Sequence, residues 1–335
     1  LDTHAFVEAP MSRAANGKSI VLGNSDGTLL QILVDRLQIP SSLWHDAPIA
    51  AVAFLPGGQR LLASDFDADA RSGEVRLWDV TTGEYQQIGE EGDSPANLLT
   101  AHPRGHIFAT GGIGSDVIVR DTSTHAAVQR LPVGSKGITA LAFSRTGDYL
   151  AAAPRMGAIQ IYATADWKSI ELPHDENAGK VDALTFSPGD QLLAAARENG
   201  QIELYRHGSH WERERTLSIE QVPTSLCFCE EGALLAIGTD AGEIHFWEPE
   251  THTMRRVVKG HSARVSVMAC LPNQTTIVTG GRDRSLKLWD TASGELSATM
   301  AGHFRQIFAL DVASDGKTMA SGALDHEIRL WRGSP

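Results

Sequence analysis

The sequence has little of what several classes of protein require. Only 3 of its 335 residues are cysteines, too few for a disulfide framework, and their spacing resembles no zinc motif. No run approaches the length of a membrane-spanning apolar segment, so we expect no transmembrane helix. Basic residues are the scarcer charge, with 29 Lys and Arg against 41 Asp and Glu and a net charge of −12. That balance argues against nucleic acid or a membrane as the partner, because both need a basic surface.

Helical periodicity, a leader and common catalytic motifs are absent as well. Apolar residues at positions i, i+3, i+4 and i+7 are not sustained anywhere, so no helix is predicted. Neither a Gly-rich phosphate loop nor a nucleophile elbow occurs. The chain opens on Leu1 rather than Met and shows no signal peptide. We therefore expect a cytoplasmic location, and a piece excised from a longer chain.

What the sequence does contain is a repeat, marked by 32 glycines and 14 prolines spread along its length. A segment that alternates apolar and polar residues ends at positions 78, 120, 162, 205, 247, 289 and 331, in steps of 42 or 43 residues. Residues 29–32 fit the same frame 46 residues before Trp78, which makes eight units. Because the step is nearly constant, we expect one domain over residues 1–335 without an internal boundary.

Each unit is predicted to contain four strands. The alternating segment is typical of a half-buried strand, and a strand of small residues precedes it, as at 277–280. Earlier still comes an apolar strand closed by a turn with Pro or Gly, as at 185–189. A further turn leads to a polar fourth strand, such as 211–215, whose charges suit an exposed outer edge. Four-stranded units of about 42 residues, repeated in this way, describe a β-propeller.

Residues at fixed places in these units carry a family resemblance. The dipeptides concerned are Trp78-Asp79, Trp289-Asp290, the related Trp247-Glu248 and Trp331-Arg332, and Gly260-His261 and Gly302-His303. The chain resembles the WD-repeat β-propeller family over essentially its whole length. Its Ala-rich strands and Phe-Ser-Pro-Gly turns are similar to those of prokaryotic members. It departs from the pattern in the middle units, where Arg120, Tyr162 and Tyr205 occupy the Trp position.

The expected fold is all-β, a single WD-repeat β-propeller of eight four-stranded blades. Seven blades are the alternative, if the N-terminal unit does not join the ring. The last unit ends four residues after Trp331, so its outer strand must come from elsewhere. In the family, the N-terminal segment usually supplies that strand. Only residues 1–6 precede the first inner strand here, so we expect the closure to be short or truncated.

The last two units contain the three residue types of a hydrolase triad, His, Ser or Thr, and Asp. A hydroxyl already bonded to an indole N–H, and present twice, is a poor nucleophile, so we predict no catalytic residue. The resemblance implies instead two stabilising tetrads of hydrogen-bonded side chains. Their members are His261, Thr279, Asp283, Trp289, His303, Ser321, Asp325 and Trp331. His45, Ser64 and Trp78 resemble a partial third set.

Three other groups of residues suggest metal sites, and for each a simpler interpretation is preferred. Residues 65–69 resemble the start of a calcium loop, but Ala70 and Arg76 stand where Gly and Glu are required, so an acidic solvated loop is preferred. His207 and His210 have no third ligand nearby in the sequence. The cysteines, of which 227 and 229 share one face of a strand and cannot readily pair with each other, are expected to be small buried thiols. We predict no metal and no cofactor.

Charge is distributed unevenly along the chain. Residues 251–290 hold seven basic and two acidic side chains, 7 − 2 = +5, whereas residues 61–95 hold two basic and nine acidic ones, 2 − 9 = −7. In a WD-repeat ring, the loops carrying His261 and Asp283 open on the face that such proteins usually use for binding. We expect four arginines there, placed to bind carboxylates or phosphates: Arg264, Arg282, Arg284 and Arg305. Ordinary solvated charges are the alternative interpretation.

The preferred function is a non-catalytic scaffold that binds a protein or peptide through this face. The expected partner carries an acidic or phosphorylated segment, and the ring is expected to be monomeric. Two alternatives remain at this stage. One is a sensor or regulatory domain of a larger signalling protein, and the other is a metal-dependent enzyme that uses the central channel of the propeller.

Overall fold

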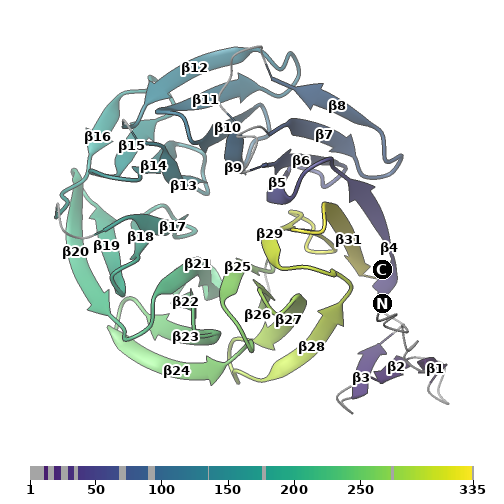
Figure 1. The fold of residues 1–335 in the computed structure, drawn as a ribbon. Helices are drawn as coiled ribbons and strands as arrows, with labels where there is room; N and C mark the ends of the chain where they lie inside the picture. Colours follow the sequence, from purple (N-terminus) through teal and green to yellow (C-terminus); the bar gives the residue numbers. More distant parts are fainter. Residues whose placement is uncertain are drawn as a thin grey trace, which may run out of the picture.

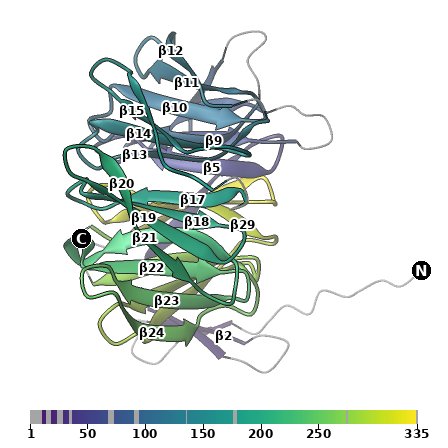
Figure 2. The ribbon, with the colours of Figure 1, turned by 90° about the vertical axis from the view of Figure 1, so that its left-hand side faces the viewer.

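Seven four-stranded antiparallel sheets stand around a central channel in the computed structural model (Figures 1 and 2). The structure describes residues 11–13, 19–23, 29–33, 37–67, 73–89, 95–134, 136–175, 179–272 and 275–333. Each sheet is one blade of a β-propeller. The described residues also include a short 3-10 helix, η2 (Glu230–Gly232). None of their helices has the length and apolar character that crossing a membrane would require.

The blades are numbered in chain order, and the first strand of each lies next to the channel (Figure 1). Blade 1 contains β5 (Ile49–Phe54), β6 (Arg60–Asp65), β7 (Val75–Asp79) and β8 (Tyr85–Ile88). Blade 2 contains β9 (Ala96–Ala101), β10 (Ile107–Gly112), β11 (Asp116–Asp121) and β12 (Ala127–Pro132). Blade 3 contains β13 (Ile138–Phe143), β14 (Tyr149–Pro154), β15 (Gln160–Ala163) and β16 (Ser169–Glu171). Blade 4 contains β17 (Val181–Phe186), β18 (Leu192–Arg197), β19 (Gln201–His207) and β20 (Trp211–Ser218). Blade 5 contains β21 (Pro223–Cys229), β22 (Leu234–Thr239), β23 (Glu243–Glu248) and β24 (Thr253–Lys259). Blade 6 contains β25 (Val265–Cys270), β26 (Thr276–Gly281), β27 (Ser285–Asp290) and β28 (Leu296–Ala301). Blade 7 contains β29 (Ile307–Val312), β30 (Thr318–Ala323), β31 (Glu327–Gly333) and a strand from the other end of the chain, β4 (Leu37–Trp44).

The pairing of β31 with β4 closes the ring. The register places Glu327 opposite Trp44 and Ile328 opposite Leu43. Leu43 is buried in a core cluster that also contains Ile49 of blade 1. The last blade therefore takes its outer strand from the N-terminal part of the chain, as the family resemblance implied. Residues 37–44 supply that strand, and not the first six residues.

The expected count of eight blades is wrong, and the alternative of seven is confirmed. The first three strands, β1 (Met11–Arg13), β2 (Ser19–Gly23) and β3 (Leu29–Leu33), form a separate three-stranded sheet outside the ring (Figure 1). The strand that follows them, β4, pairs with β31 instead of completing this sheet. In the ring, β29 of blade 7 lies directly against β5 of blade 1, and the backbone N–H of Phe54 donates to Asp311 Oδ2 across 2.7 Å. An eighth blade has no place between them.

Small side chains in the second strand of each blade allow neighbouring blades to pack closely. β10, β18 and β22 are buried along their whole length, and Ala194, Ala195 and Ala196 of β18 are fully enclosed. Neighbouring blades cover both faces of these strands near the axis, where the blades converge. The small-residue strands predicted from the sequence therefore reflect packing between blades.

The tightest of these contacts lies at the junction of blades 7 and 1. A Cβ added to Gly322 would lie 2.3 Å from Ile49 Cγ2, much closer than two carbon atoms can pack. A Cβ added to Gly280 would likewise lie 2.9 Å from Ile307 Cγ2, at the junction of blades 6 and 7. A glycine in the second strand thus admits a β-branched side chain from the first strand of the next blade.

We predict that Gly322→Ala lowers the free energy of unfolding by about 1–3 kcal/mol, because the added methyl group overpacks this junction. Denaturant titration measures the change. Gly208→Ala is the matched control, since a Cβ there meets no atom within 4 Å. Equal unfolding midpoints for the two variants would contradict this packing.

A second prediction concerns the closing strand. A chain that begins at residue 37 keeps every blade, so its melting temperature should stay within a few degrees of that of the full chain. A chain that begins at residue 45 lacks β4, leaves β31 as an unpaired edge, and loses the buried side chain of Leu43. It should melt earlier and less cooperatively. Similar calorimetric transitions for the two truncated chains would show that β4 does not hold the ring.

Candidate functional site

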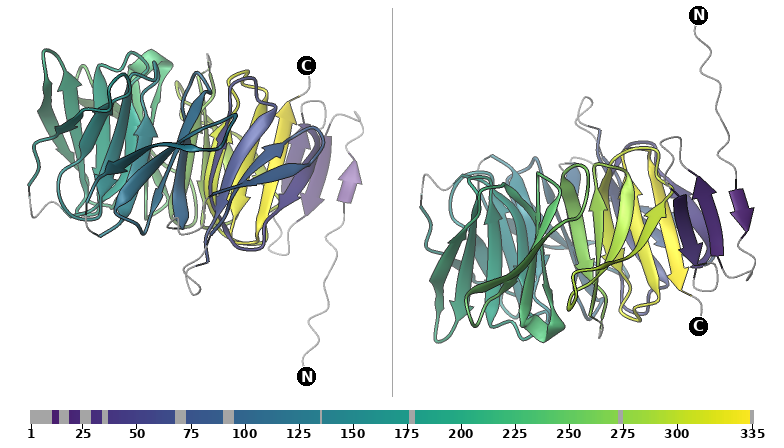
Figure 3. Two further views of the ribbon diagram at one scale, coloured as in Figure 1. Left: turned by 90° about the horizontal axis from the view of Figure 1, so that it is seen from above. Right: turned by 90° about the horizontal axis from the view of Figure 1, so that it is seen from below.

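The strands run across the thickness of the ring, so the connecting turns gather on its two faces (Figure 3). We call the top face the one that carries the loops leading into each first strand and the loops between second and third strands. In blade 6 these are residues 260–264 and 282–284. The bottom face carries the other turns of each blade, which join first to second and third to fourth strands.

Four side chains of blade 6 form a continuous chain of hydrogen bonds from the core to the top face. The indole Nε1 of Trp289 donates to Thr279 Oγ1 across 3.0 Å, and His261 Nε2 lies 2.8 Å from the same hydroxyl. His261 Nδ1 lies 2.9 Å from Asp283 Oδ1. Thr279 is fully buried, so its hydroxyl is shielded from any substrate as well as engaged on two sides.

Blade 7 repeats the arrangement with nearly the same distances. Trp331 Nε1 donates to Ser321 Oγ across 2.9 Å, and His303 Nε2 lies 2.8 Å from that oxygen. His303 Nδ1 lies 3.0 Å from Asp325 Oδ2, which also accepts the backbone N–H of Phe304 across 2.8 Å. The structure thus brings together the members of each predicted set.

The two carboxylates remain ionised because several donors surround them. Burial by itself would raise the pKa of Asp283, but hydrogen bonds from His261, Ser285 and the backbone N–H of Ser262 hold it well below its ordinary value. The pKa of Asp325 is also lowered, since hydrogen bonds from His303 and from the N–H groups of Phe304 and Glu327 outweigh the effect of burial. Each carboxylate therefore anchors a loop of the top face.

The partial set in blade 1 is built differently from the prediction. Trp78 Nε1 donates directly to His45 Nε2 across 3.1 Å, and the buried hydroxyl of Ser64 makes no hydrogen bond with a described residue. The carboxylate beside His45 is Asp65, with its Oδ2 3.0 Å from Nδ1. Asp65 is only 2% exposed and also accepts the N–H of Glu74, so it belongs to the core. It is not a free ligand for calcium, and the middle of that predicted loop, residues 68–72, lies outside the described residues.

A buried ion pair in blade 4 was not predicted. Arg197 Nε donates to Glu203 Oε2 across 2.6 Å, and Tyr205, at the Trp position, donates to the same oxygen across 2.8 Å. Arg213 reaches the other oxygen of Glu203. An Arg, a Glu and a Tyr thus form a polar network in a unit that lacks the His and Trp of the tetrads. The signal available in the sequence was an arginine at 197, the last residue of the second strand, where no other blade has a basic residue.

The four predicted arginines lie on the top face of blades 6 and 7. The loops of Arg264 and Arg282 are joined by the backbone N–H of Arg282, which donates to the Arg264 carbonyl across 2.9 Å. The Arg282 guanidinium lies 5.7 Å from the ring centre of Phe308 in blade 7. Arg284 and Arg305 are exposed in loops of the same face. We call these four residues and Phe304 the arginine sector.

Within the described part of the chain, none of the four arginines is in an ion pair with a carboxylate. Burial lowers the pKa of Arg264, the charge of Asp182 opposes this shift, and nearby Arg282 adds to it. Asp283 and Asp325, the acids closest in sequence, are engaged by their histidines. Phe304 is next to Arg305 in the sequence and is 72% exposed, with the guanidinium of Arg329 6.0 Å from its ring centre. The sector therefore combines guanidinium groups that form no ion pair in the described residues with a large exposed aromatic ring.

The prediction that the cysteines are small buried thiols is wrong for two of the three. Cys229 of β21 and Cys270 of β25 form a disulfide between blades 5 and 6, and Cys227 is a free thiol. The two bonded residues are 41 apart, about one repeat, and each is the last residue of the first strand of its blade. The predicted inability of Cys227 and Cys229 to pair with each other agrees with this arrangement.

The two histidines considered as metal ligands take part in aromatic packing or lie at the surface. His207 stacks on Trp211, with 4.7 Å between ring centres, and His210 is exposed beside it. Among the described residues, neither belongs to a group of three or more side chains placed to share a metal ion.

We predict that Asp325→Ala lowers the free energy of unfolding at neutral pH by about 1–3 kcal/mol, since His303 and two backbone N–H groups lose their acceptor. The folded-state pKa of Asp325 lies below the ordinary value of 3.8. Its ionised form therefore contributes stability above that pH, and the contribution is lost as the pH falls. Denaturant titrations should show a smaller difference in unfolding free energy between the variant and the wild type at pH 3 than at pH 7. A constant difference would exclude this role.

Comparison with known proteins agrees with the fold. The family model of the WD domain, G-beta repeat, matches residues 252–290 and 294–332, which are the two units with complete tetrads. Histone acetyltransferase type B subunit 2 of Kluyveromyces lactis is 29% identical over 63% of this chain and 58% of its own length. WD repeat-containing protein 90 of Xenopus tropicalis is 24% identical over 64% of this chain and 12% of its own. Echinoderm microtubule-associated protein-like 1 of Rattus norvegicus is 22% identical over 83% of this chain and 38% of its own.

These three relatives are eukaryotic, so they give no support to the expected likeness to prokaryotic members. The chain spans less than two thirds of the length of each of them. The repeat matches, the similarity to WD-repeat proteins and the four-stranded blades lead to one conclusion: the chain is a β-propeller that carries WD repeats, two of which match the family model.

Proposed function

We propose that this propeller is a non-catalytic scaffold that captures a protein or peptide through the arginine sector of its top face. The partner carries an acidic or phosphorylated segment. The observation that carries the proposal is the group of four arginines, Arg264, Arg282, Arg284 and Arg305, which form no ion pair within the described residues and lie on the same face as the exposed ring of Phe304.

The chemistry of guanidinium groups supports an anionic ligand. Each one presents a planar set of N–H donors that matches two oxygens of a carboxylate or phosphate. Surface arginines often satisfy these donors with a neighbouring Asp or Glu, as Arg206 does with Glu214 on the outer strand of blade 4. In the arginine sector two aspartates of the top-face loops, Asp283 and Asp325, are already bonded to histidines. An acidic partner would supply the acceptors that these side chains lack.

Phe304 supports a protein or peptide rather than a free small anion. Its side chain is 72% exposed, and its backbone N–H is held by Asp325, so the ring projects from a fixed loop. Exposed aromatic residues beside arginines are typical of the few residues that dominate the energy of protein interfaces. The apolar ring would contribute buried area, while the arginines select for negative charge.

The absence of a catalytic assignment follows from the tetrads. The hydroxyls of Ser321 and Thr279 each lie 2.8 Å from a histidine, and both are buried and shared with an indole. The relatives add support through their names, which describe a subunit of a histone acetyltransferase, a WD repeat-containing protein and a microtubule-associated protein. Such names fit a family whose members contribute binding surfaces to larger assemblies.

The test uses a library of immobilised peptides in phosphorylated, Asp-rich and neutral versions. We predict that the wild-type protein prefers anionic peptides, and that replacing Arg264, Arg282 and Arg305 together with Gln weakens the best of them at least about tenfold. Each lost charge-assisted hydrogen bond costs about 1.5–3 kcal/mol at most. Raised ionic strength should weaken the wild-type complex in the same direction.

The control variant replaces three arginines outside the sector with Gln, the exposed Arg60 and Arg215 and the half-buried Arg256, to match two exposed and one half-buried arginine in the first variant. It has the same net charge as the first triple variant. A difference in peptide binding between the two variants therefore reports a local binding site and not the overall charge of the protein. Equal loss of binding in the two triple variants, or no preference for anionic peptides, would refute the proposal. Unchanged thermal melting of both variants confirms that the ring is intact in the comparison.

A further inference from the structure

Three sulfur atoms converge where blades 5 and 6 meet, on the bottom face, at the opposite end of β25 from Arg264 of the arginine sector. Cys227 and Cys229 lie on β21 and Cys270 lies on β25, both of which are first strands beside the central channel (Figure 1). The three sulfurs all lie within 4.8 Å of one another. In the structure, two of them are joined as the Cys229–Cys270 disulfide.

The convergence is a property of rigid strands. Side chains at i and i+2 of a strand project from one face, so both cysteines of β21 are directed to the side where β25 runs. The Cα atoms of Cys229 and Cys270 are 5.7 Å apart. Cys229 is part of a core cluster with Leu234 and Val265, and the other two cysteines pack against that cluster. The positions of the three sulfurs are therefore set by the packing of two blades, as a preorganised site requires.

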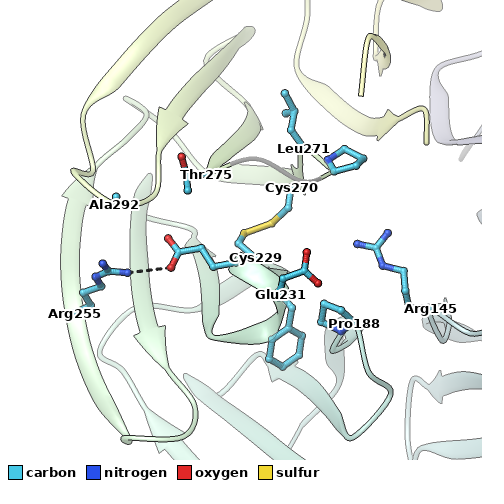
Figure 4. Close-up of a pocket in the computed structure, with 12 residues that line it drawn as sticks. Arg145, Pro188, Cys229, Glu231, Arg255, Cys270, Leu271, Thr275 and Ala292 are labelled. Atoms are coloured by element: carbon cyan, nitrogen blue, oxygen red, sulfur yellow. Dashed lines mark hydrogen bonds and ion pairs between the residues drawn. A yellow bond between two sulfur atoms is a disulfide. The ribbon is translucent and has the colours of Figure 1, made fainter. Parts of the chain in front are cut away.

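The cluster is accessible from one side. Cys229 and Cys270 line a depression of about 800 Å³ on the bottom face between blades 5 and 6. Figure 4 shows the disulfide in this depression, with Glu231 beside it and Arg145 across from it. Cys270 also lines the central channel, together with Cys227. A small ion or a reductant could reach the sulfurs from the bottom face without unfolding a blade.

Two neighbours of Cys227 favour its thiolate, although burial has the larger effect and raises the pKa of this thiol to about 12. The backbone N–H of Cys270 donates to the sulfur, and the charge of Arg145 acts on the same group. N–H donors of this kind are typical second neighbours of metal-bound ligands, where they orient the sulfur and stabilise its charge. Among the described residues, no salt bridge or strong hydrogen bond competes for the three sulfurs.

We propose that reduction of the Cys229–Cys270 disulfide converts this cluster into a three-thiolate site for a soft divalent cation of the zinc type. In tetrahedral coordination with Zn–S bonds of about 2.3 Å, neighbouring sulfurs are about 3.8 Å apart. The sulfurs, already within 4.8 Å of one another, need only small side-chain movements to adopt this spacing. The fourth position faces the depression and is filled by water or by a ligand that enters from it.

The chemistry balances in two steps. A dithiol reductant transfers two electrons and two protons to the disulfide, which becomes the thiols of Cys229 and Cys270, while the dithiol is oxidised to its own disulfide. The cation then replaces the protons of the three thiols and releases them to solvent. In the oxidised protein only Cys227 is available as a ligand, so the site exists in one redox state alone.

The other group of potential metal ligands, His303, Asp325 and Glu327, does not offer such a site. His303 and Asp325 are committed to the tetrad of blade 7. Glu327 accepts hydrogen bonds from Arg329, at 2.9 Å from Nε, and from Ser42. The cysteine cluster differs because its third sulfur, that of Cys227, has no side-chain partner in the described residues.

The experiment titrates Cd²⁺, whose thiolate complexes absorb in the near ultraviolet, into the oxidised and the dithiol-reduced protein. We predict one Cd²⁺ bound per reduced chain and none per oxidised chain, with competition by Zn²⁺. Circular dichroism of the reduced protein checks that the propeller remains folded. This comparison uses the wild-type chain alone, so it does not depend on the folding of a variant.

A Cys227→Ser variant keeps the disulfide and removes the third ligand. After reduction it should bind Cd²⁺ at least about 100-fold more weakly than the wild type. Cys227→Ser binding as tightly as the wild type would overturn the proposal, and so would a reduced wild-type chain that binds no Cd²⁺. Thiol counting that shows the disulfide to be reducible only on unfolding would overturn it as well.

Discussion

The pairing of β4 with β31 is the interaction on which the rest of this structure depends. A ring of sheets that stops at β31 would leave blade 7 with three strands and an open edge beside blade 1. The strand that fills the edge comes from residues 37–44, so the two ends of the propeller are joined by backbone hydrogen bonds. Leu43 is thereby placed in a core cluster shared with blade 1. Closure gives blade 7 the same four strands as the other six blades and joins all seven in one ring.

Close packing near the axis follows from closure and explains much of the composition. Seven first strands meet around the channel, and the second strands behind them have a neighbouring blade on either face. Alanine fills this space in β18, and Gly322 admits Ile49 where a methyl group would collide. The third strands, which lie farther from the axis, carry large side chains such as Trp289 and Trp331. The tetrads lie at the same depth and connect this core to the loops of the top face, so the arginine sector rests on a rigid support.

The two faces of blades 5 to 7 differ in their chemistry. The top face presents guanidinium groups and Phe304, which suit an anionic partner. The bottom face presents a depression with sulfur in its wall. Both features come from residues about one repeat apart, such as Arg264 and Arg305 or Cys229 and Cys270. A propeller repeats one backbone path, so residues about one repeat apart lie close together in adjacent blades. When both residues are of the same type, their side chains form a patch on one face.

The sequence by itself determined the repeat, the order of strands within each blade, and the residue types of the two tetrads, because these depend on local alternation and constant spacing. The tertiary structure decided what depends on contacts between distant segments. The number of blades follows from whether β4 pairs with β3 or with β31, and both strands have suitable patterns. Asp65 was expected in a solvated loop, but its place at the end of β6 directs it to His45. Cys270 meets Cys229 only because blades 5 and 6 lie side by side. In each case the sequence offers several partners, and the geometry of the closed ring selects one.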